Sequence, residues 1–327
     1  MKSLNCIAFA LLSTCLFISC KPQPSIEKTG GVTFYLESAK GQLQPNEVKD
    51  VMGILERRFE KFEESGVAFS GTFDQETQQF IISLAGAKEA STYRNVITSQ
   101  ANLIIAESFD APEIFNHLSS VNQLMLDEDN LGLFVTDKAD TLAMSSPLFS
   151  LLTPPVDLRG QLDNSPLMGY ALPEDTPTIN RIFKHQKVKE LMPDEFLPYW
   201  SQKALGGRLQ LYATKANSGL KGQIVESTRI AYLFQSDRLQ LVIQLKPRFH
   251  QEWEEITEKN IDKALPIIIN GKVYSAPKVA APIEGGALSI VGFESEEEAG
   301  SIGALIESPQ LPVRLIIVSE EIVGPSL

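Results

Sequence analysis

The stretch that decides the fold reads Ile267-Ile268-Ile269-Asn270-Gly271-Lys272-Val273-Tyr274-Ser275-Ala276-Pro277-Lys278-Val279. Its apolar, β-branched beginning favours a buried strand over about 265–269. Asn-Gly is the pair preferred in a two-residue hairpin turn, because both of its central residues take a positive φ. The stretch therefore predicts a β-hairpin that continues into Lys272–Tyr274, followed by an extended segment through Pro277.

The residues on either side of this hairpin predict an alternation of helices and strands. A helix is expected over 249–263, and further strands over 209–213, 230–234 and 239–245. Gly285-Gly286 predicts a turn into a strand over 288–291. Ser295 with Glu298 forms a capping-box pattern for a helix that runs to about Glu307, and 313–318 predicts a final strand.

The N-terminal third of the chain predicts a second α+β unit. Alternating residues over 32–37 favour a strand, and Pro45 is suited to the first turn of the helix that follows. Strands are expected over 67–73 and 80–84, a second helix over 88–99, and a buried strand over 103–106. This β-α-β-β-α-β order is the ferredoxin-like arrangement. Residues from about 110 to 205 are less regular, and their prolines argue against long elements. Within them, a helix is expected over 179–191, before Pro193.

The C-terminal pattern resembles the SecD/SecDF family, in its first periplasmic domain. The hairpin followed by Ser275-Ala276-Pro277 is similar to the family signature, with Asn270 in place of the usual Asp. The resemblance continues in order along most of residues 31–327. It is carried by Leu55-Glu56-Arg57-Arg58, Gly66-Val67, Leu84-Ala85-Gly86, Trp253, Thr257, Asn260, Ile283-Glu284-Gly285-Gly286, Ser289–Phe293, Glu297-Glu298-Ala299, Leu311-Pro312-Val313 and Val323–Leu327.

The resemblance implies an α+β fold with a ferredoxin-like base subdomain and an α+β head subdomain. We expect the base at 31–110, an insertion at 111–205 and the head at 206–308. The last segment, 309–327, would return to the base as a strand. In the family, Val-Gly-Pro-Ser-Leu leads into transmembrane helices, which this sequence does not contain. We therefore expect a stand-alone lipoprotein without the proton-coupled channel.

The first residues predict a lipoprotein signal peptide. Lys2 is followed by an apolar run over 7–18 and by Ser19-Cys20, which resembles a lipobox cut before a lipidated cysteine. An ordinary secretory signal is the alternative. The expected limits are 1–19 for the signal peptide and 20–30 for a tether. A fatty-acid anchor such as palmitate on Cys20 would be the only membrane attachment, on the periplasmic side of the cell envelope.

Composition argues against several classes of function. The formal net charge of −12 leaves no basic cluster for nucleic acid. His117, His185 and His250 are far apart and lack metal-ligand spacing, so we expect no metal and no cofactor. Ser275-Ala276-Pro277-Lys278 matches the Ser-x-x-Lys motif of acyl-transfer enzymes, but Pro277 excludes the helix on which that serine must lie. We therefore expect no enzyme activity.

The resemblance implies a periplasmic accessory in protein export that binds or holds translocating polypeptides without proton coupling. The implied partners are exported polypeptides and components of the Sec translocon. Turns of the head would shape the binding site, which gives Gly271, Ser275, Pro277, Gly285 and Gly286 as candidates. A general periplasmic chaperone and a structural lipoprotein that docks an envelope partner remain as alternatives.

Overall fold

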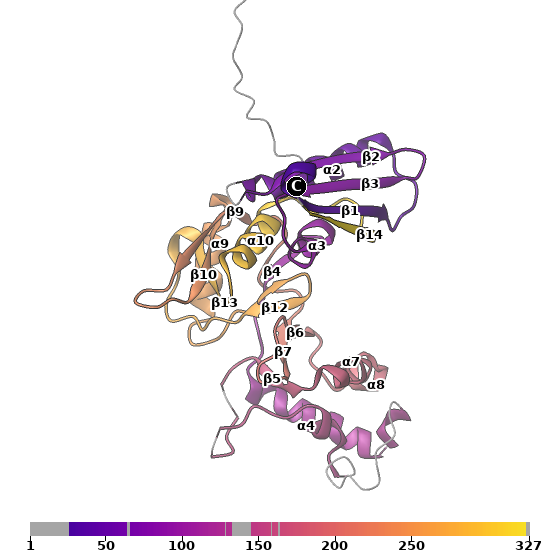
Figure 1. Cartoon of the computed structure of the whole chain (residues 1–327). Coiled ribbons are helices and arrows are strands. Elements are labelled where there is room, and N and C mark those ends of the chain that lie inside the picture. The colour runs from indigo at the N-terminus through magenta and orange to yellow at the C-terminus, as the bar shows by residue number, and fades with distance from the viewer. Residues whose placement is uncertain are drawn as a thin grey trace, which may run out of the picture.

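The computed structural model describes residues 26–63, 66–127, 129–132, 145–157, 159–162 and 164–324. The predicted signal peptide, Cys20 and residues 325–327 lie outside these ranges. Over the described residues, the strands form three sheets and the helices pack against them (Figure 1). This arrangement confirms the predicted α+β class.

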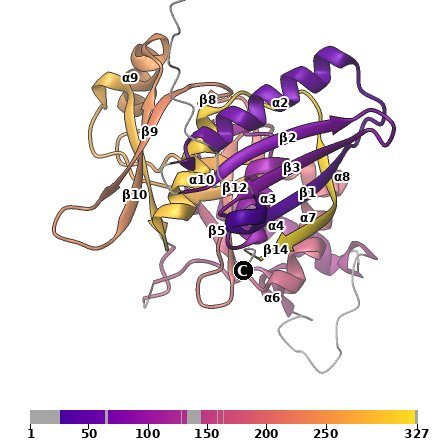
Figure 2. The same ribbon diagram turned by 45° about the horizontal axis from the view of Figure 1, so that its top comes forward.

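The base is a four-stranded antiparallel sheet within the described residues, in the order β14-β1-β3-β2. Its strands are β1 (Gly31–Ser38), β2 (Ala68–Asp74), β3 (Gln79–Ala85) and β14 (Leu315–Val323). The C-terminal strand β14 pairs with β1 along its whole length, from Gly31 opposite Val323 to Ser38 opposite Leu315. Figure 2 shows the four strands side by side beneath helix α2 (Pro45–Glu60). The short helix α1 (Ile26–Thr29) precedes β1.

One face of the base sheet holds the first apolar core. Alternate residues of β1 and β3, among them Phe34, Leu36 and Ile82, are fully buried against α2 and α3 (Ala90–Thr98). This period-two burial follows from the pleat of a strand that has one covered face. Leu315 of β14 joins the same core.

The fourth base strand is β14, and the strand predicted over 103–106 lies elsewhere, which corrects the sequence interpretation. Strand β4 (Leu103–Ile105) pairs with β11 (Ile267–Ile269) in another sheet. Ala101 takes φ 59°, so the chain turns away from the base after α3. A wholly apolar strand of three residues suits the position beside the buried strand β11, whereas the mixed polar sequence of β14 suits the sheet edge that it occupies.

The head contains a three-stranded antiparallel sheet, in the order β13-β10-β9 among the described strands. These are β9 (Val225–Tyr232), β10 (Leu239–Leu245) and β13 (Ala287–Phe293). Helix α9 (His250–Lys259), which follows η4 (Pro247–Phe249), and helix α10 (Glu296–Glu307) complete this part. The predicted cap of α10 is confirmed, because the Glu298 backbone N–H donates to Ser295 Oγ over 3.1 Å.

The remaining described strands make a seven-stranded sheet, in the order β5-β7-β6-β12-β11-β4-β8. It adds β5 (Leu167–Ala171), β6 (Phe196–Ser201), β7 (Leu209–Lys215), β8 (Leu220–Lys221) and β12 (Lys272–Ser275) to β4 and β11. The domain limit that we predicted between 205 and 206 falls inside the β6–β7 hairpin. The sheet therefore does not end there, and predicted insertion and predicted head share it.

The predicted insertion is more regular than expected. Helix α4 (Ala111–Asp127) is long, and Pro112 lies in its first turn, where the missing N–H costs nothing. Ile114, Leu118, Val121 and Met125 form its buried stripe at helical spacing. The helix predicted over 179–191 is interrupted at His185, which has an extended conformation. The other elements here are η2 (Asp129–Gly132), α6 (Pro147–Leu151), η3 (Pro173–Asp175), α7 (Thr176–Lys184) and α8 (Gln186–Lys189).

Helix α10 connects base and head, and Figures 1 and 2 both show it between them. Ala304 belongs to the base core, whereas Ile302, Leu305 and Ile306 belong to the head core. A Cβ on Gly303 would come within 2.5 Å of Thr228 Oγ1, so only glycine permits this approach to β9.

The end of α10 is held by Arg58, a fully buried arginine of α2. Its Nε donates to Ser308 Oγ over 2.9 Å, and its Nη1 donates to the Val96 carbonyl over 2.6 Å. Nη2 lies 3.5 Å from the Pro309 carbonyl. No carboxylate of the described residues pairs with this guanidinium, and burial lowers its pKa to about 10. The charge is thus stabilised by three neutral oxygens from two segments, α3 and the residues that follow α10.

We predict that Arg58→Ala lowers the free energy of unfolding by about 3–5 kcal/mol, because it leaves a cavity and three acceptors without donors. The measurement is urea unfolding followed by circular dichroism. The neighbouring Arg57 is exposed on the same helix, so Arg57→Ala is the matched control and should change stability by less than about 0.5 kcal/mol. Equal effects of the two substitutions would contradict the anchoring role of Arg58.

Candidate functional site

The predicted site residues separate into two places. The Asn270-Gly271 turn has φ values of 50° and 77°, as the Asn-Gly hairpin signal predicted. Asn270 N donates to the Asn102 carbonyl over 2.9 Å, and Asn102 N donates to Asn270 Oδ1 over 3.1 Å. Gly271 therefore lies next to the link between α3 and β4, and it is not near the other predicted site residues of the head.

Pro277 and the Gly285-Gly286 turn lie on one segment, 276–286, that borders the head sheet. Ser275 ends β12, and the Pro277 carbonyl accepts from Leu265 N over 3.0 Å. Farther along, Ile283 N donates to Oγ1 of the buried Thr257 on α9 over 2.9 Å. Hydrogen bonds at both ends thus hold this segment in an extended path beside α9.

The Gly285-Gly286 turn is a tight approach that requires glycine. Both residues have a positive φ, 72° and 73°. A Cβ on Gly286 would lie 2.4 Å from the His250 ring, so any side chain there displaces the imidazole. Gln244 Nε2 donates to the Gly285 carbonyl over 2.5 Å, and His250 Nε2 lies 2.9 Å from the Leu245 carbonyl. These contacts hold the Gly285-Gly286 turn against the end of β10.

This segment and the head sheet enclose a cavity of about 710 Å³, which we call the head groove. Val242 and Gln240 of β10 form its floor, and Trp253 of α9 contributes a wall. Trp253 Nε1 is buried without a hydrogen-bond partner among the described residues. The other lining residues are Leu265, Ile267, Pro277, Lys278, Val279, Ala280, Ala281, Pro282, Ile283, Glu284, Ala287, Leu288 and Ser289. Most of this lining is apolar, with charges only from Lys278 and Glu284.

The head groove borders the edge strand β13. In the described sheet, β13 pairs with β10 on one side only. Its first residues line the head groove, and its later residues, Ile290–Phe293, line a second cavity of about 300 Å³ beside Tyr274 and the β6–β7 hairpin. A free strand edge next to an apolar hollow is the arrangement on which extended peptides dock, since main-chain hydrogen bonds and side-chain pockets lie together.

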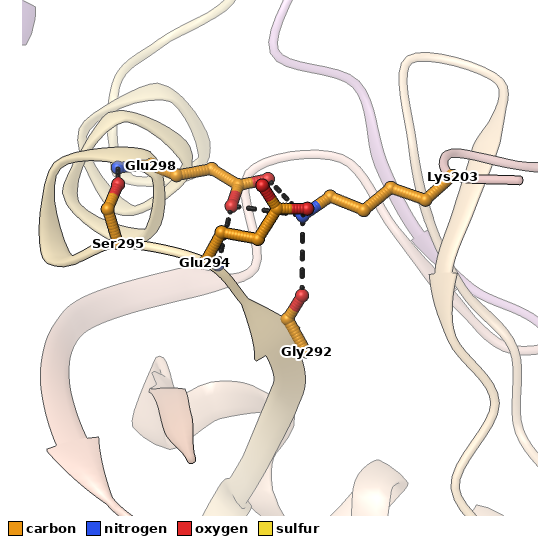
Figure 3. A network of polar contacts seen from close by, with 5 residues as sticks. All are labelled: Lys203, Gly292, Glu294, Ser295 and Glu298. Carbon is orange, nitrogen blue, oxygen red and sulfur yellow. Dashed lines mark hydrogen bonds and ion pairs between the residues drawn. The ribbon is translucent and has the colours of Figure 1, made fainter. Parts of the chain in front are cut away.

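Lys203 of the β6–β7 hairpin is a lining residue of this second cavity, and its side chain contacts the end of β13 and the start of α10 (Figure 3). Its Nζ lies 3.0 Å from Glu294 Oε1 and 2.9 Å from Glu298 Oε1, and it donates to the Gly292 carbonyl over 3.4 Å. Partial burial lowers the pKa of the ammonium, but the two carboxylates outweigh this effect and the net pKa is raised. The contact ties the seven-stranded sheet to the head sheet.

The described residues contain no group of three or more His, Cys, Asp or Glu side chains placed to hold a metal ion. Ser275 ends a strand and does not begin a helix, and Lys278 pairs with Asp262 at 3.4 Å. His117 Nδ1 contacts the Leu191 carbonyl, far along the chain from His250. Among the helices of the described part, none is both long and apolar enough to cross a membrane.

Comparison with known proteins places the head groove inside a recognised family region. Residues 198–313 match the family model described as "SecDF, P1 head subdomain". This stretch contains every lining residue of the head groove. Sequence reasoning had named Pro277, Gly285 and Gly286 of this neighbourhood, but it missed Val242 and the role of Trp253 as a wall, because these come from other elements.

The chain is also similar to curated SecD proteins. It is 23% identical to protein translocase subunit SecD of Rhodothermus marinus over 276 residues, which covers 77% of this chain and 43% of the relative. It is 26% identical to SecD of Aquifex aeolicus over 340 residues, or 99% of this chain and 64% of the relative. The chain thus spans less than two thirds of the length of either relative.

The chain is also similar to a solved structure described as "Structure and function of a membrane component SecDF that enhances protein export". The aligned region covers 88% of this chain and 98% of the solved chain. The sequence identity is 20% and the TM-score is 0.44.

We predict that Lys203 and Glu298 are coupled by about 0.5–1 kcal/mol in a double-mutant cycle of Lys203→Met and Glu298→Gln. Half-exposed ion pairs are screened, so the coupling should shrink in 1 M salt. Because the pKa of Lys203 is raised, the coupling should persist at neutral pH and disappear as pH rises past the ordinary lysine range. Coupling that is zero at low salt would show that the contact does not hold the two sheets together.

Proposed function

We propose that this protein is a SecD-like periplasmic component of protein export that binds an extended segment of a translocating polypeptide in the head groove. The observation that carries the proposal is the position of the groove. An apolar hollow beside the free edge of β13 lies wholly within the stretch that matches the SecDF P1 head subdomain. Both halves of this site suit an unfolded chain, since its backbone can pair with β13 and its apolar side chains can enter the hollow.

The shape of the groove argues against the docking alternative, whereas the chaperone alternative differs from the proposal only in where the protein acts. A structural lipoprotein that docks a folded envelope partner would use a broad, flat surface, whereas this site is a hollow of about 710 Å³. A general periplasmic chaperone would use the same groove, but away from the translocon. Crosslinking in cells through a photoreactive residue at position 288, followed by identification of the neighbours, distinguishes these functions. Translocon subunits among the neighbours support an export role, and their absence favours the chaperone.

The first prediction of this proposal concerns the floor of the groove. Val242→Asp places a carboxylate on the apolar floor, and desolvation of that charge should weaken binding at least about tenfold. The measurement is fluorescence anisotropy of a labelled unfolded exported protein with purified protein that lacks residues 1–20. We expect a wild-type Kd in the micromolar range.

The matched control for the groove is Val318→Asp on β14. Val318 is about half exposed, at 51%, and it lies on the base away from the head groove. This variant introduces the same charge and should leave binding unchanged. If both variants bind like wild type, or if wild type binds no unfolded client, the groove is not a polypeptide site.

We further propose that the protein is attached to the membrane through lipid on Cys20. Six positions separate Cys20 from Ile26, where α1 begins beside β3. Fully extended, six residues span at most about 21 Å. Lipid on Cys20 would therefore keep the base close to the membrane surface.

The prediction for the anchor is that a fatty-acid analogue labels the wild-type protein in growing cells but not Cys20→Ala. Cys6→Ala is the matched control, because Cys6 lies within the expected signal peptide and should not carry lipid. Label that survives in Cys20→Ala would show that Cys20 is not the lipidated residue.

A further inference from the structure

The second cavity, beside the later residues of β13, is lined by different chemistry from the head groove. Its volume is about 300 Å³, and its hydrogen-bonding and charged lining comes mainly from Gln202, Lys203, Gln210, Tyr212, Tyr274 and Glu298. The head groove, in contrast, is lined mostly by apolar side chains. The two hollows border the same strand but suit different side chains.

The order of hydrogen bonds in the head sheet shows which backbone groups of β13 are free. Leu233 N donates to the Arg238 carbonyl over 2.9 Å at the end of the β9–β10 hairpin, so these two residues form a hydrogen-bonded pair. Such pairs alternate with non-hydrogen-bonded pairs along an antiparallel ladder. Leu241 and Ile243 of β10 therefore direct their backbone groups towards β13.

Ser289 and Val291 of β13 direct their N–H and C=O groups to the free edge. Their neighbours Leu288 and Ile290 lie opposite the two β10 residues that face β13, and they use their backbone groups within the sheet. Ser289 lines the head groove and Val291 lines the second cavity. A polypeptide paired with both residues would therefore pass along both hollows.

Tyr274 carries a hydroxyl group without a partner at the second cavity. Its ring packs against the head core, which positions the side chain. The hydroxyl makes no hydrogen bond with the residues that the structure describes. Burial and the nearby carboxylate of Glu298 raise the pKa of Tyr274 to about 12. The hydroxyl is therefore protonated at neutral pH, and it can donate a hydrogen bond as well as accept one.

Gln210 offers a second free donor. Its Oε1 accepts from the Tyr212 O–H over 3.2 Å, whereas its Nε2 has no acceptor among the described residues. Both residues lie on β7 and Tyr274 lies on β12, so all three belong to strands of the seven-stranded sheet. The polar groups of the second cavity are thus carried by regular strands, and β13 lines the same cavity.

The charges at the second cavity are already paired with one another. Lys203 contacts Glu294 and Glu298, and it donates to the Gly292 carbonyl. Glu298 Oε2 also accepts from the Glu294 backbone N–H over 2.9 Å. A carboxylate in the cavity would meet one lysine and two carboxylates, and an ammonium group would have to displace Lys203. The cavity therefore favours an uncharged side chain that forms hydrogen bonds.

We propose that the second cavity is a specificity subsite of the polypeptide site, and that it binds an uncharged amide side chain, Asn or Gln, of a segment paired with β13. An amide carries both donors and an acceptor, so it matches the free hydroxyl of Tyr274 and the free Nε2 of Gln210. This inference rests on the function proposed for the head groove, because it names the kind of residue that accompanies an apolar stretch in the same bound segment.

The test uses labelled peptides of about twelve residues, long enough to cover β13 and both hollows at about 3.3 Å per residue. Each peptide begins with a Leu-Val block for the head groove and carries one variable residue among Ser and Gly. The variable residue is Gln, Met, Glu or Lys, and it is moved along the peptide one position at a time. A second series carries the block at the other end, so that both directions along β13 are covered. Binding to the protein without residues 1–20 is measured by fluorescence anisotropy.

We expect Gln to bind about three- to tenfold more tightly than Met at one position of the peptide and not at the others. Met has nearly the shape of Gln, but it leaves the free groups of the cavity without partners. Glu and Lys should bind less tightly than Gln at the same position, because each would bring an unpaired charge into the cavity.

Tyr274→Phe removes the free hydroxyl and should lower the preference for Gln over Met about threefold, while the affinity for the Met peptide stays within about twofold of wild type. A general loss of structure would weaken both peptides and would not change the preference. Tyr35→Phe is the matched control, because it removes a hydroxyl from β1 of the base, where it donates to Glu321 over 3.3 Å. This control should leave the preference unchanged, and circular dichroism checks that both variants are folded.

Val242→Asp separates this inference from the function on which it rests, since it should weaken the Gln and Met peptides equally. Equal binding of Gln and Met at every position, or an unchanged preference in Tyr274→Phe, would overturn the subsite and leave the head groove as a polypeptide site. Tighter binding of Lys than of Gln would show that the carboxylates select the ligand, and it would likewise overturn the inference. If wild type binds none of the peptides, the function proposed for the head groove fails, and the subsite fails with it.

Discussion

The burial of helix α10 on two sides is the constraint on which the rest of the structure depends. One side carries Ala304 into the base core, and the other carries Leu305 and Ile306 into the head core. Arg58 fixes the C-terminal end through Ser308 and Pro309, and Lys61 of the same region forms an ion pair with Glu307. Because a close-packed helix cannot shift against one neighbour without disturbing the other, base and head are mechanically coupled through α10.

The coupling between base and head extends to the candidate site because β13 and α10 are consecutive elements of the chain. Strand β13 borders the head groove and leads within three residues into α10, whose capping serine is Ser295. Lys203 holds the same junction from the opposite sheet. A polypeptide that adds to β13 therefore acts on a strand whose end is fixed at two points. Its contacts are made with a pre-organised edge, which reduces the ordering cost of binding to that of the incoming segment.

The sequence predicted those parts of the fold that depend on neighbouring residues. The Asn270-Gly271 turn, the Ser295 cap and the final strand could be found because their signals are local. The error at 103–106 arose because three apolar residues specify a buried strand but not its partner, which is chosen by Ile267–Ile269 far along the chain. Helix α4 was missed because the prolines farther along the segment, from Pro147 on, argued against long elements, although α4 itself contains only Pro112, in its first turn. The head groove had only part of a signal, since its lining residues come from segments that meet only in the folded chain.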